Sequence, residues 1–205
     1  MKNLVAFGDS CTFGHGLIDC HLPNGDPGPK PSQLAWPHQL AKKLQLKPSN
    51  LGIPGASNKE IVNKILTTKL DTDCCVVICW SYIDRHSLIK KHSIEQVGPW
   101  KKDKISKSFY KHLYDRHDRM WEFYSKFNQI KMFLDSKQIA NYHFHVDQDE
   151  LEPVKWNQFD MMPVDYANIR TKNPLAEDNL HPGPRAHKEL ADDIFKQIRT
   201  SSSSG

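Results

Sequence analysis

The sequence predicts an α/β protein in which a central parallel sheet lies between two layers of helices. Apolar runs of strand length alternate along the chain with segments of helical periodicity, which is the pattern of consecutive strand–helix–strand units. Residues 74–80 (CCVVICW) are apolar throughout, as expected of a central strand that is covered on both faces. The length of 205 residues suits one domain with its own core, which we place at residues 1–199.

The first half of the chain supplies three predicted strands and two helices. The strands are expected at residues 2–7, 50–53 and 74–80, and the first helix at 33–46. A loop rich in proline and glycine precedes that helix at residues 21–31. Ser57 and Glu60 form a capping box that opens the second helix, because the Ser57 hydroxyl can accept from the Glu60 amide.

The second half begins with a long segment, residues 85–119, inserted after the third strand. Apolar residues, many of them aromatic, recur at helical spacing over residues 109–134, which predicts a long helix that packs on the core. A fourth strand is expected at residues 139–146 and a last helix at 184–199, followed by a disordered tail at 200–205. In such sheets ligands gather beyond the carboxyl ends of the strands, so the residues that follow each strand should converge.

Composition excludes several classes of protein. The chain is 38% hydrophobic and 25% charged, as in ordinary globular proteins, and no apolar run approaches the ~20 residues of a membrane span. The first residues reach a polar turn too soon for a signal peptide, so we expect a cytoplasmic protein that does not bind membranes. Five cysteines without a Cys-x-x-Cys pair indicate buried, reduced thiols.

Positive charge is concentrated in the basic segment, which is the name we use for residues 85–119. It holds ten Lys or Arg residues and four acids, a net charge of +6, whereas the whole chain is +4. This segment is a candidate lid or specificity element that attracts an anionic partner. A lysine-rich face that only contacts solvent, and association with nucleic acid, are the alternative interpretations.

Three residues from opposite ends of the chain could perform nucleophilic catalysis. Ser10 follows the first predicted strand, and a serine hydroxyl attacks well only when a neighbouring base takes its proton. Asp178 and His181 are three residues apart in a loop stiffened by proline, so the carboxylate can meet the imidazole Nδ1 while Nε2 faces outward. Backbone amides of Ser10 and Gly55 are candidate oxyanion donors, since Gly55 lies in a glycine-rich turn after the second strand.

These residues fall in three blocks that resemble the SGNH (GDSL-type) hydrolase family. The blocks are GDSCTFG at 8–14, NLGIPG at 50–55 and DNLHP at 178–182. The resemblance implies a flavodoxin-like three-layer α/β/α sandwich and a serine hydrolase that cleaves carboxylic esters, including acyl or acetyl esters of carbohydrates, without a cofactor. It assigns the nucleophile to Ser10, the glycine donor to Gly55, the orienting acid to Asp178 and the base to His181.

One block departs from the family pattern. After its third strand the family has Gly-x-Asn-Asp, whose asparagine side chain is a further oxyanion donor. Here Ser81 stands at the glycine and Ile83 at the asparagine, and an isoleucine side chain cannot donate a hydrogen bond. The hydroxyl of Ser81 or of Tyr82 is a candidate substitute. A tryptophan–serine pair at this point also resembles phage SGNH-like proteins.

Two further groups of residues have side chains that could serve a function. His143, His145 and Asp147 alternate along the fourth strand and could bind a metal, but we expect histidines near a pocket rim and no metal. We expect His187 on the surface of the last helix and Cys11 in a packing role. The alternative to an esterase is a binding module or phage structural protein of impaired catalysis, in which the basic segment contacts an anionic partner. The oligomeric state stays open.

Overall fold

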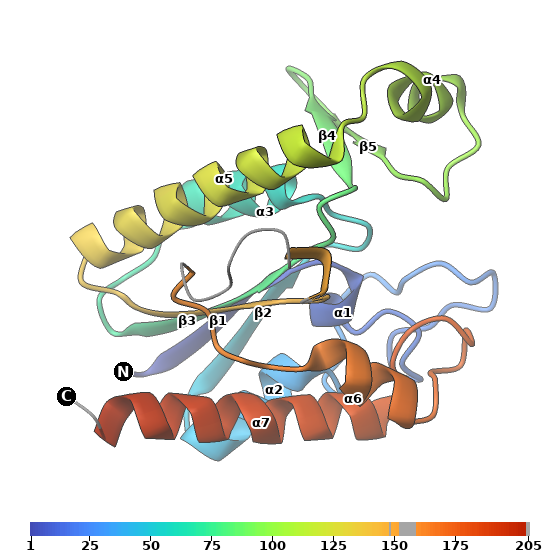
Figure 1. Cartoon of the computed structure of the whole chain (residues 1–205). Helices are drawn as coiled ribbons and strands as arrows, with labels where there is room; N and C mark the ends of the chain where they lie inside the picture. The colour runs from blue at the N-terminus through green and yellow to red at the C-terminus, as the bar shows by residue number, and fades with distance from the viewer. Residues whose placement is uncertain (148, 152–158, 204–205) are drawn as a thin grey trace.

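The computed structural model of the chain describes residues 1–147, 149–151 and 159–203. Four parallel strands form the central sheet in the order β2-β1-β3-β6 (Figure 1). Their bounds are Asn3–Gly8 for β1, Lys47–Gly52 for β2, Cys74–Trp80 for β3 and Ala140–His145 for β6. This order is that of a flavodoxin-like sheet, so the predicted fold class is confirmed.

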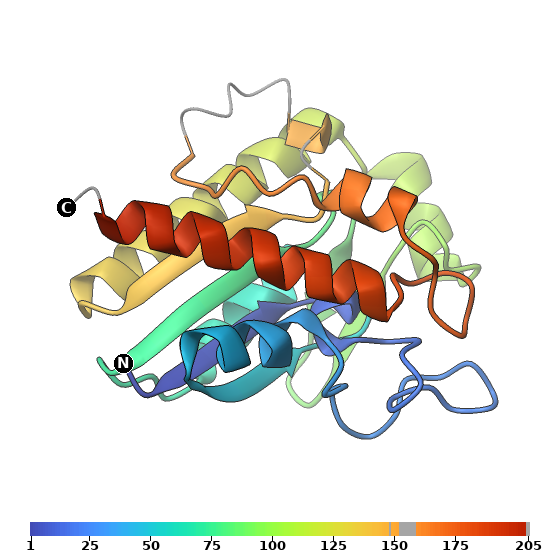
Figure 2. The same cartoon turned by 90° about the horizontal axis from the view of Figure 1, so that it is seen from below.

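Helices cover both faces of the sheet, as Figures 1 and 2 show from two directions. One face carries α2 (Trp36–Leu44), α6 (Tyr166–Lys172) and α7 (Pro184–Ser203), and the other carries α3 (Asn58–Thr67) and α5 (Arg116–Ser136). Successive residues of a strand point to opposite faces, so Leu4 enters the first core and Val5 the second. Both faces of the sheet carry apolar side chains because helices cover both of them.

The second strand begins earlier than the sequence predicts. We expected residues 50–53, whereas β2 starts at Lys47 because that residue pairs with Asn3 at the beginning of β1. Pro48 is accommodated because β2 is an edge strand, where a missing backbone donor leaves no neighbour unpaired.

The last helix runs further than expected. We predicted disorder from residue 200, whereas α7 continues to Ser203. Adding a residue to an existing helix costs far less than starting one, so the preceding turns extend the helix into the serine run. Residues 204–205 of the expected tail lie outside the described residues. Within the described part of the chain no helix is both long and apolar enough to span a membrane.

The basic segment forms a hairpin and a helix at one end of the sandwich (Figure 1). Strands β4 (His86–Ile89) and β5 (Ile94–Val97) pair antiparallel, and α4 (Lys104–His112) follows. The helix predicted across residues 109–134 is therefore two helices. Asp115 separates them because its carboxylate caps α5, accepting from the Asp118 amide at 2.9 Å.

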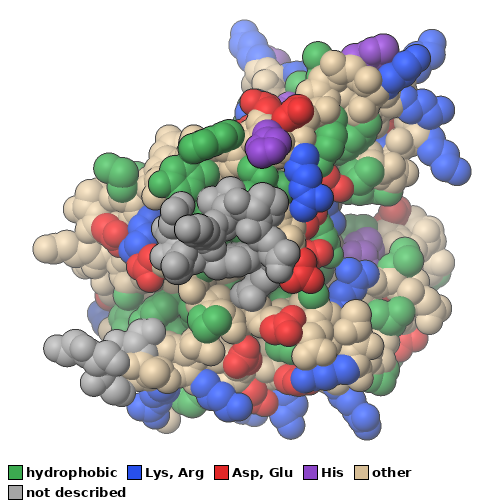
Figure 3. Space-filling model, in the orientation of Figure 1, with side chains coloured by type: hydrophobic (Ala, Val, Ile, Leu, Met, Phe, Trp, Pro, Cys, Tyr) green, Lys and Arg blue, Asp and Glu red, His purple; other side chains and the backbone are tan. Residues whose placement is uncertain are grey.

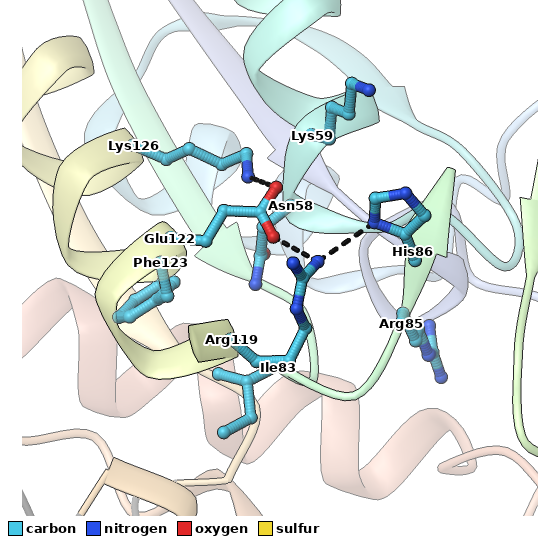
Figure 4. A pocket seen from close by; sticks show the side chains of 9 residues that line it. All are labelled: Asn58, Lys59, Ile83, Arg85, His86, Arg119, Glu122, Phe123 and Lys126. Atoms are coloured by element: carbon cyan, nitrogen blue, oxygen red, sulfur yellow. Dashed lines mark hydrogen bonds and ion pairs between the residues drawn. The ribbon is translucent and has the colours of Figure 1, made fainter. Parts of the chain in front are cut away.

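Charged side chains join the hairpin to α5 (Figure 4). Glu122 pairs with both Arg119 and Lys126, and the Arg119 guanidinium lies 3.0 Å from His86 Nδ1. The hollow between them measures about 10 Å³, which is room for about one water molecule. We therefore regard this cluster as a structural joint between elements.

Candidate active site

The end of β1 presents Ser10 at the carboxyl edge of the sheet. The strand stops at Gly8, and the short helix α1 (Ser10–Phe13) begins two residues later. Asp9 is the N-cap of α1, and its Oδ1 accepts from the Cys11 amide at 2.9 Å. Ser10 itself is buried, with 5% of its surface exposed.

The predicted acid–base pair forms within one tight loop. Asp178 Oδ2 lies 2.5 Å from His181 Nδ1. The other carboxylate oxygen accepts from the backbone N–H groups of Leu180 and His181, both at 3.0 Å. The contact between the carboxylate and the imidazole spans only three residues, which is why spacing alone could predict it.

This loop docks on the segment that directly follows α1. The Glu177 amide donates to Gly16 O at 3.1 Å, and the rings of His15 and His181 have centroids 4.4 Å apart. The His15 amide in turn donates to Ser10 O at 3.1 Å. Gly16 has φ +87°, and a Cβ there would lie 2.7 Å from the Asp178 carboxylate, so only glycine allows this approach. The two ends of the chain therefore meet beside Ser10.

No hydrogen bond joins Ser10 Oγ to His181 within the described residues. Neither Ser10 Oγ nor His181 Nε2 has another hydrogen-bond partner among these residues. Catalytic hydrogen bonds are often long before substrate binds and tighten in the reactive complex.

The environment sets the protonation states that a base and its orienting acid require. Burial lowers the pKa of His181, against the opposing effect of the Asp178 carboxylate. Burial acts to raise the pKa of Asp178, but the N–H groups of His181 and Leu180 outweigh it and the pKa is lowered. At neutral pH the imidazole is therefore a free base and the carboxyl is ionised.

The two backbone amides predicted as oxyanion donors are those of Ser10 and Gly55. Among the described residues, neither the Ser10 nor the Gly55 N–H has an acceptor. Gly55 has φ +75°, and a Cβ there would meet Gln96 Oε1 at 2.6 Å. Gln96 also donates to Pro54 O at 2.9 Å, so a residue of the basic segment holds this turn in place.

The third strand ends without the side-chain donor of the family pattern. Ile83 is buried and its amide donates to Glu150 Oε2 at 3.1 Å. The Ser81 hydroxyl is fully buried and donates to Asp9 Oδ2 at 3.1 Å, which uses its only proton. The Tyr82 hydroxyl accepts from Arg170 Nη1 at 3.1 Å. The Ser81 proton is thus used by Asp9. Of the two candidate substitutes, only the Tyr82 hydroxyl still has a proton to donate.

Arg85 lies at this site although no motif in the sequence predicts it. Its Nη1 donates to Asp9 Oδ2 at 2.7 Å and to Ser81 Oγ at 3.1 Å. In the sequence, Arg85 is only one of the ten positive charges of the basic segment. No local signal points to it, because its partner Asp9 is 76 residues away in the chain.

The histidines of the fourth strand belong to the core. His143 and His145 are 1% and 0% exposed, which corrects their expected place at a pocket rim. His143 accepts from Trp80 Nε1 at 3.2 Å, and burial lowers its pKa to about 3 and that of His145 to about 4. Both rings stay neutral because a charged imidazole would lose its hydration in the buried core.

His187 is likewise not at the surface. It is 1% exposed and its Nδ1 accepts from the Trp36 amide at 3.2 Å, because α7 buries this face against α2. Cys11 is buried as expected, and desolvation raises the pKa of its thiol to about 12, so it is unsuited to act as a nucleophile.

One compact group in the described part of the chain offers metal-ligand atoms. His15, Asp178 and His181 place one such atom each within 4.8 Å of one another. His15 Nε2 already lies 3.1 Å from Gly25 O, and the other two residues bond each other. A metal there would have to displace the contact between Asp178 and His181.

Comparison with known proteins supports the fold. No protein-family model matches the chain, and no curated protein does. Solved structures do: an aryl esterase from M. smegmatis covers 98% of this chain, with 99% of its own length aligned, 12% identity and a TM-score of 0.56.

Two further solved structures give the same result. A member of the lipolytic G-D-S-L family from Veillonella parvula matches 96% of this chain and 97% of its own, at 12% identity and a TM-score of 0.52. An acetyl xylan esterase from Butyrivibrio proteoclasticus matches 98% of this chain and 64% of its own, at 11% identity and a TM-score of 0.57. The chain therefore has the SGNH (GDSL-type) hydrolase fold. None of these neighbours supports the suggested phage origin.

Proposed function

We propose that the protein is a serine hydrolase that cleaves carboxylic esters through an acyl-enzyme on Ser10. The observation that carries this proposal is the Asp178–His181 pair, held by a 2.5 Å contact on the segment that follows Ser10. The SGNH esterase fold supports the same reaction class.

The residues take complementary roles in two steps. His181 Nε2 accepts the Ser10 proton as Oγ bonds to the ester carbon, and Asp178 stabilises the imidazolium through Nδ1. The Ser10 and Gly55 amides hold the oxyanion. The intermediate collapses when the ester C–O bond breaks and His181 returns the proton to the leaving alcohol. Water then attacks the acyl carbon by the reverse sequence and frees Ser10.

A cavity next to the histidine loop could receive part of the substrate. It measures about 470 Å³ and is lined by Tyr82, Val146, Asp147, Ala167, Arg170, Thr171, Asn173 and Leu175. Arg170 joins it to the site, since its Nη2 donates to Leu180 O at 3.0 Å beside His181. The mixture of hydroxyl, amide and apolar groups suits an acetylated sugar or another small polar ester.

Labelling with a fluorophosphonate probe tests this function directly. We expect one covalent adduct, mapped by mass spectrometry to Ser10, together with hydrolysis of para-nitrophenyl acetate. Ser10→Ala should abolish both. Cys11→Ala is the matched control and should keep the adduct, because it removes the neighbouring thiol and leaves the hydroxyl. An adduct that persists in Ser10→Ala would contradict the assignment.

The basic segment favours a substrate that carries negative charge. Lys101, Lys107 and Lys111 line a hollow of about 500 Å³ beside Tyr110, and Lys107 and Lys111 have no ion pair within the described residues. Figure 3 shows Lys and Arg side chains gathered at this end of the molecule. Their summed field would attract a carboxylate- or phosphate-bearing ester.

We expect kcat/KM for an acidic acetylated oligosaccharide to exceed that for a neutral one at low salt. The advantage should fall in 0.5 M NaCl and in Lys107→Ala/Lys111→Ala, because both weaken the positive field. Lys69→Ala/Lys188→Ala removes two exposed lysines elsewhere and is the control. Equal preference in all cases would count against charge selection.

The alternative is a binding module of the same fold with little turnover, for which the missing donor at Ile83 is the specific observation. Tight, salt-dependent binding of the acidic glycan without Ser10 labelling would favour this alternative.

A further inference from the structure

We propose that Arg85 supplies the third oxyanion-hole donor, in place of the side-chain donor that Ile83 cannot provide. This inference rests on the proposed serine hydrolase function and adds one catalytic residue to it. Arg85 enters the site from a different position of the same loop, two residues further along the chain.

The first support is the position of the guanidinium group. Nη1 makes hydrogen bonds to Asp9 Oδ2 and Ser81 Oγ, at 2.7 and 3.1 Å. Asp9 directly precedes Ser10, and its other oxygen caps α1. The carboxylate therefore ties the guanidinium to the turn that presents the nucleophile.

The second support is the inventory of donors. A guanidinium carries five N–H groups, and the two contacts above engage only Nη1. Within the described residues Nη2 and Nε have no partner, and the Arg85 side chain keeps 14% of its surface exposed. These three N–H groups are thus open to a bound molecule instead of being sealed in the core.

The third support is the rigidity of the group. The guanidinium carbon lies 4.8 Å from the centroid of the Tyr82 ring and 4.9 Å from that of Trp100. Aromatic contacts and the ion pair with Asp9 fix the planar group before substrate arrives. Figure 4 shows that Arg85 extends away from the Arg119–Glu122–Lys126 cluster, so that cluster does not engage it.

Charge explains why this donor matters most in the transition state. As Ser10 Oγ bonds to the ester carbon, the C=O π electrons move to oxygen and the Ser10 proton passes to His181. The new oxyanion then accepts from the Ser10 and Gly55 amides and from Arg85. A fixed cation stabilises this oxygen far more than the neutral carbonyl that precedes it.

Substitution of Arg85 tests the proposal. Arg85→Gln should lower kcat about 100- to 1,000-fold with KM nearly unchanged. Arg85→Lys keeps a cation for Asp9, so it should preserve thermal stability, yet its single nitrogen cannot also reach the oxyanion and kcat should fall similarly. Affinity for a boronate that mimics the tetrahedral intermediate should drop in parallel. Arg185→Gln, an exposed arginine on α7, is the control.

The outcomes separate the two proposals. Labelled, folded Arg85 variants that keep kcat within about threefold of wild type, or that change only KM, would overturn the role of Arg85 and leave the esterase assignment intact. Wild-type protein without hydrolysis or Ser10 labelling would overturn both. A loss of kcat that follows the boronate affinity, with unfolding temperature unchanged in Arg85→Lys, supports the inference.

Discussion

Replacing His181 with alanine is expected to lower kcat for a short acetyl ester by about 10⁴- to 10⁶-fold. The reason is that His181 is the base that a carboxylate orients beside Ser10, and the described residues offer no second histidine paired in this way. His181 has its Nδ1 on Asp178, which leaves Nε2 as the acceptor for the Ser10 proton. Steady-state hydrolysis and burst kinetics measure the loss.

His117→Ala is the matched control, because His117 is exposed on α5 and should leave the rate unchanged. The nearest competitor is His15, whose ring lies 4.4 Å from that of His181. A His181→Ala variant that keeps most of its activity, and loses it only when His15 is also replaced, would assign the base to His15 instead.

Asp178→Asn is expected to cost about 10⁴-fold in kcat, although the substitution changes almost no volume. Asp178 Oδ1 accepts two backbone N–H groups, at 3.0 Å each. An asparagine oxygen must therefore stay on that side, which places its NH₂ against His181 Nδ1. The imidazole would then carry its proton on Nε2 and could not accept one from Ser10.

The pH profile measures a second effect of the same substitution, the loss of the Asp178 charge beside His181. In the wild type, kcat/KM should fall as pH drops through the pKa of His181, which burial holds below its ordinary value. Asp178 acts to raise that pKa, so its loss should move the acid limb to still lower pH. Glu177→Gln removes a neighbouring exposed acid and should change neither rate nor profile. An acid limb that moved upward in Asp178→Asn would contradict this effect of Asp178 on the pKa of His181.

Features that depend on local pattern are readable from the amino-acid order. Strand and helix periodicity predicted the parallel sheet and its two helical layers, because burial on one or both faces leaves a repeat of fixed period. The Asp178–His181 pair was also predictable, since a separation of three residues in a tight loop already brings the two side chains together.

Which distant residues share the site follows from the folded arrangement of the elements. Arg85 reaches Asp9 across 76 residues, and Gln96 of the hairpin meets Gly55, contacts that no short-range pattern encodes. The same holds for burial. His187 looked like a surface residue, yet packing of α7 on α2 encloses it. A side chain's exposure depends on the elements that cover it, and only the folded chain brings those elements together.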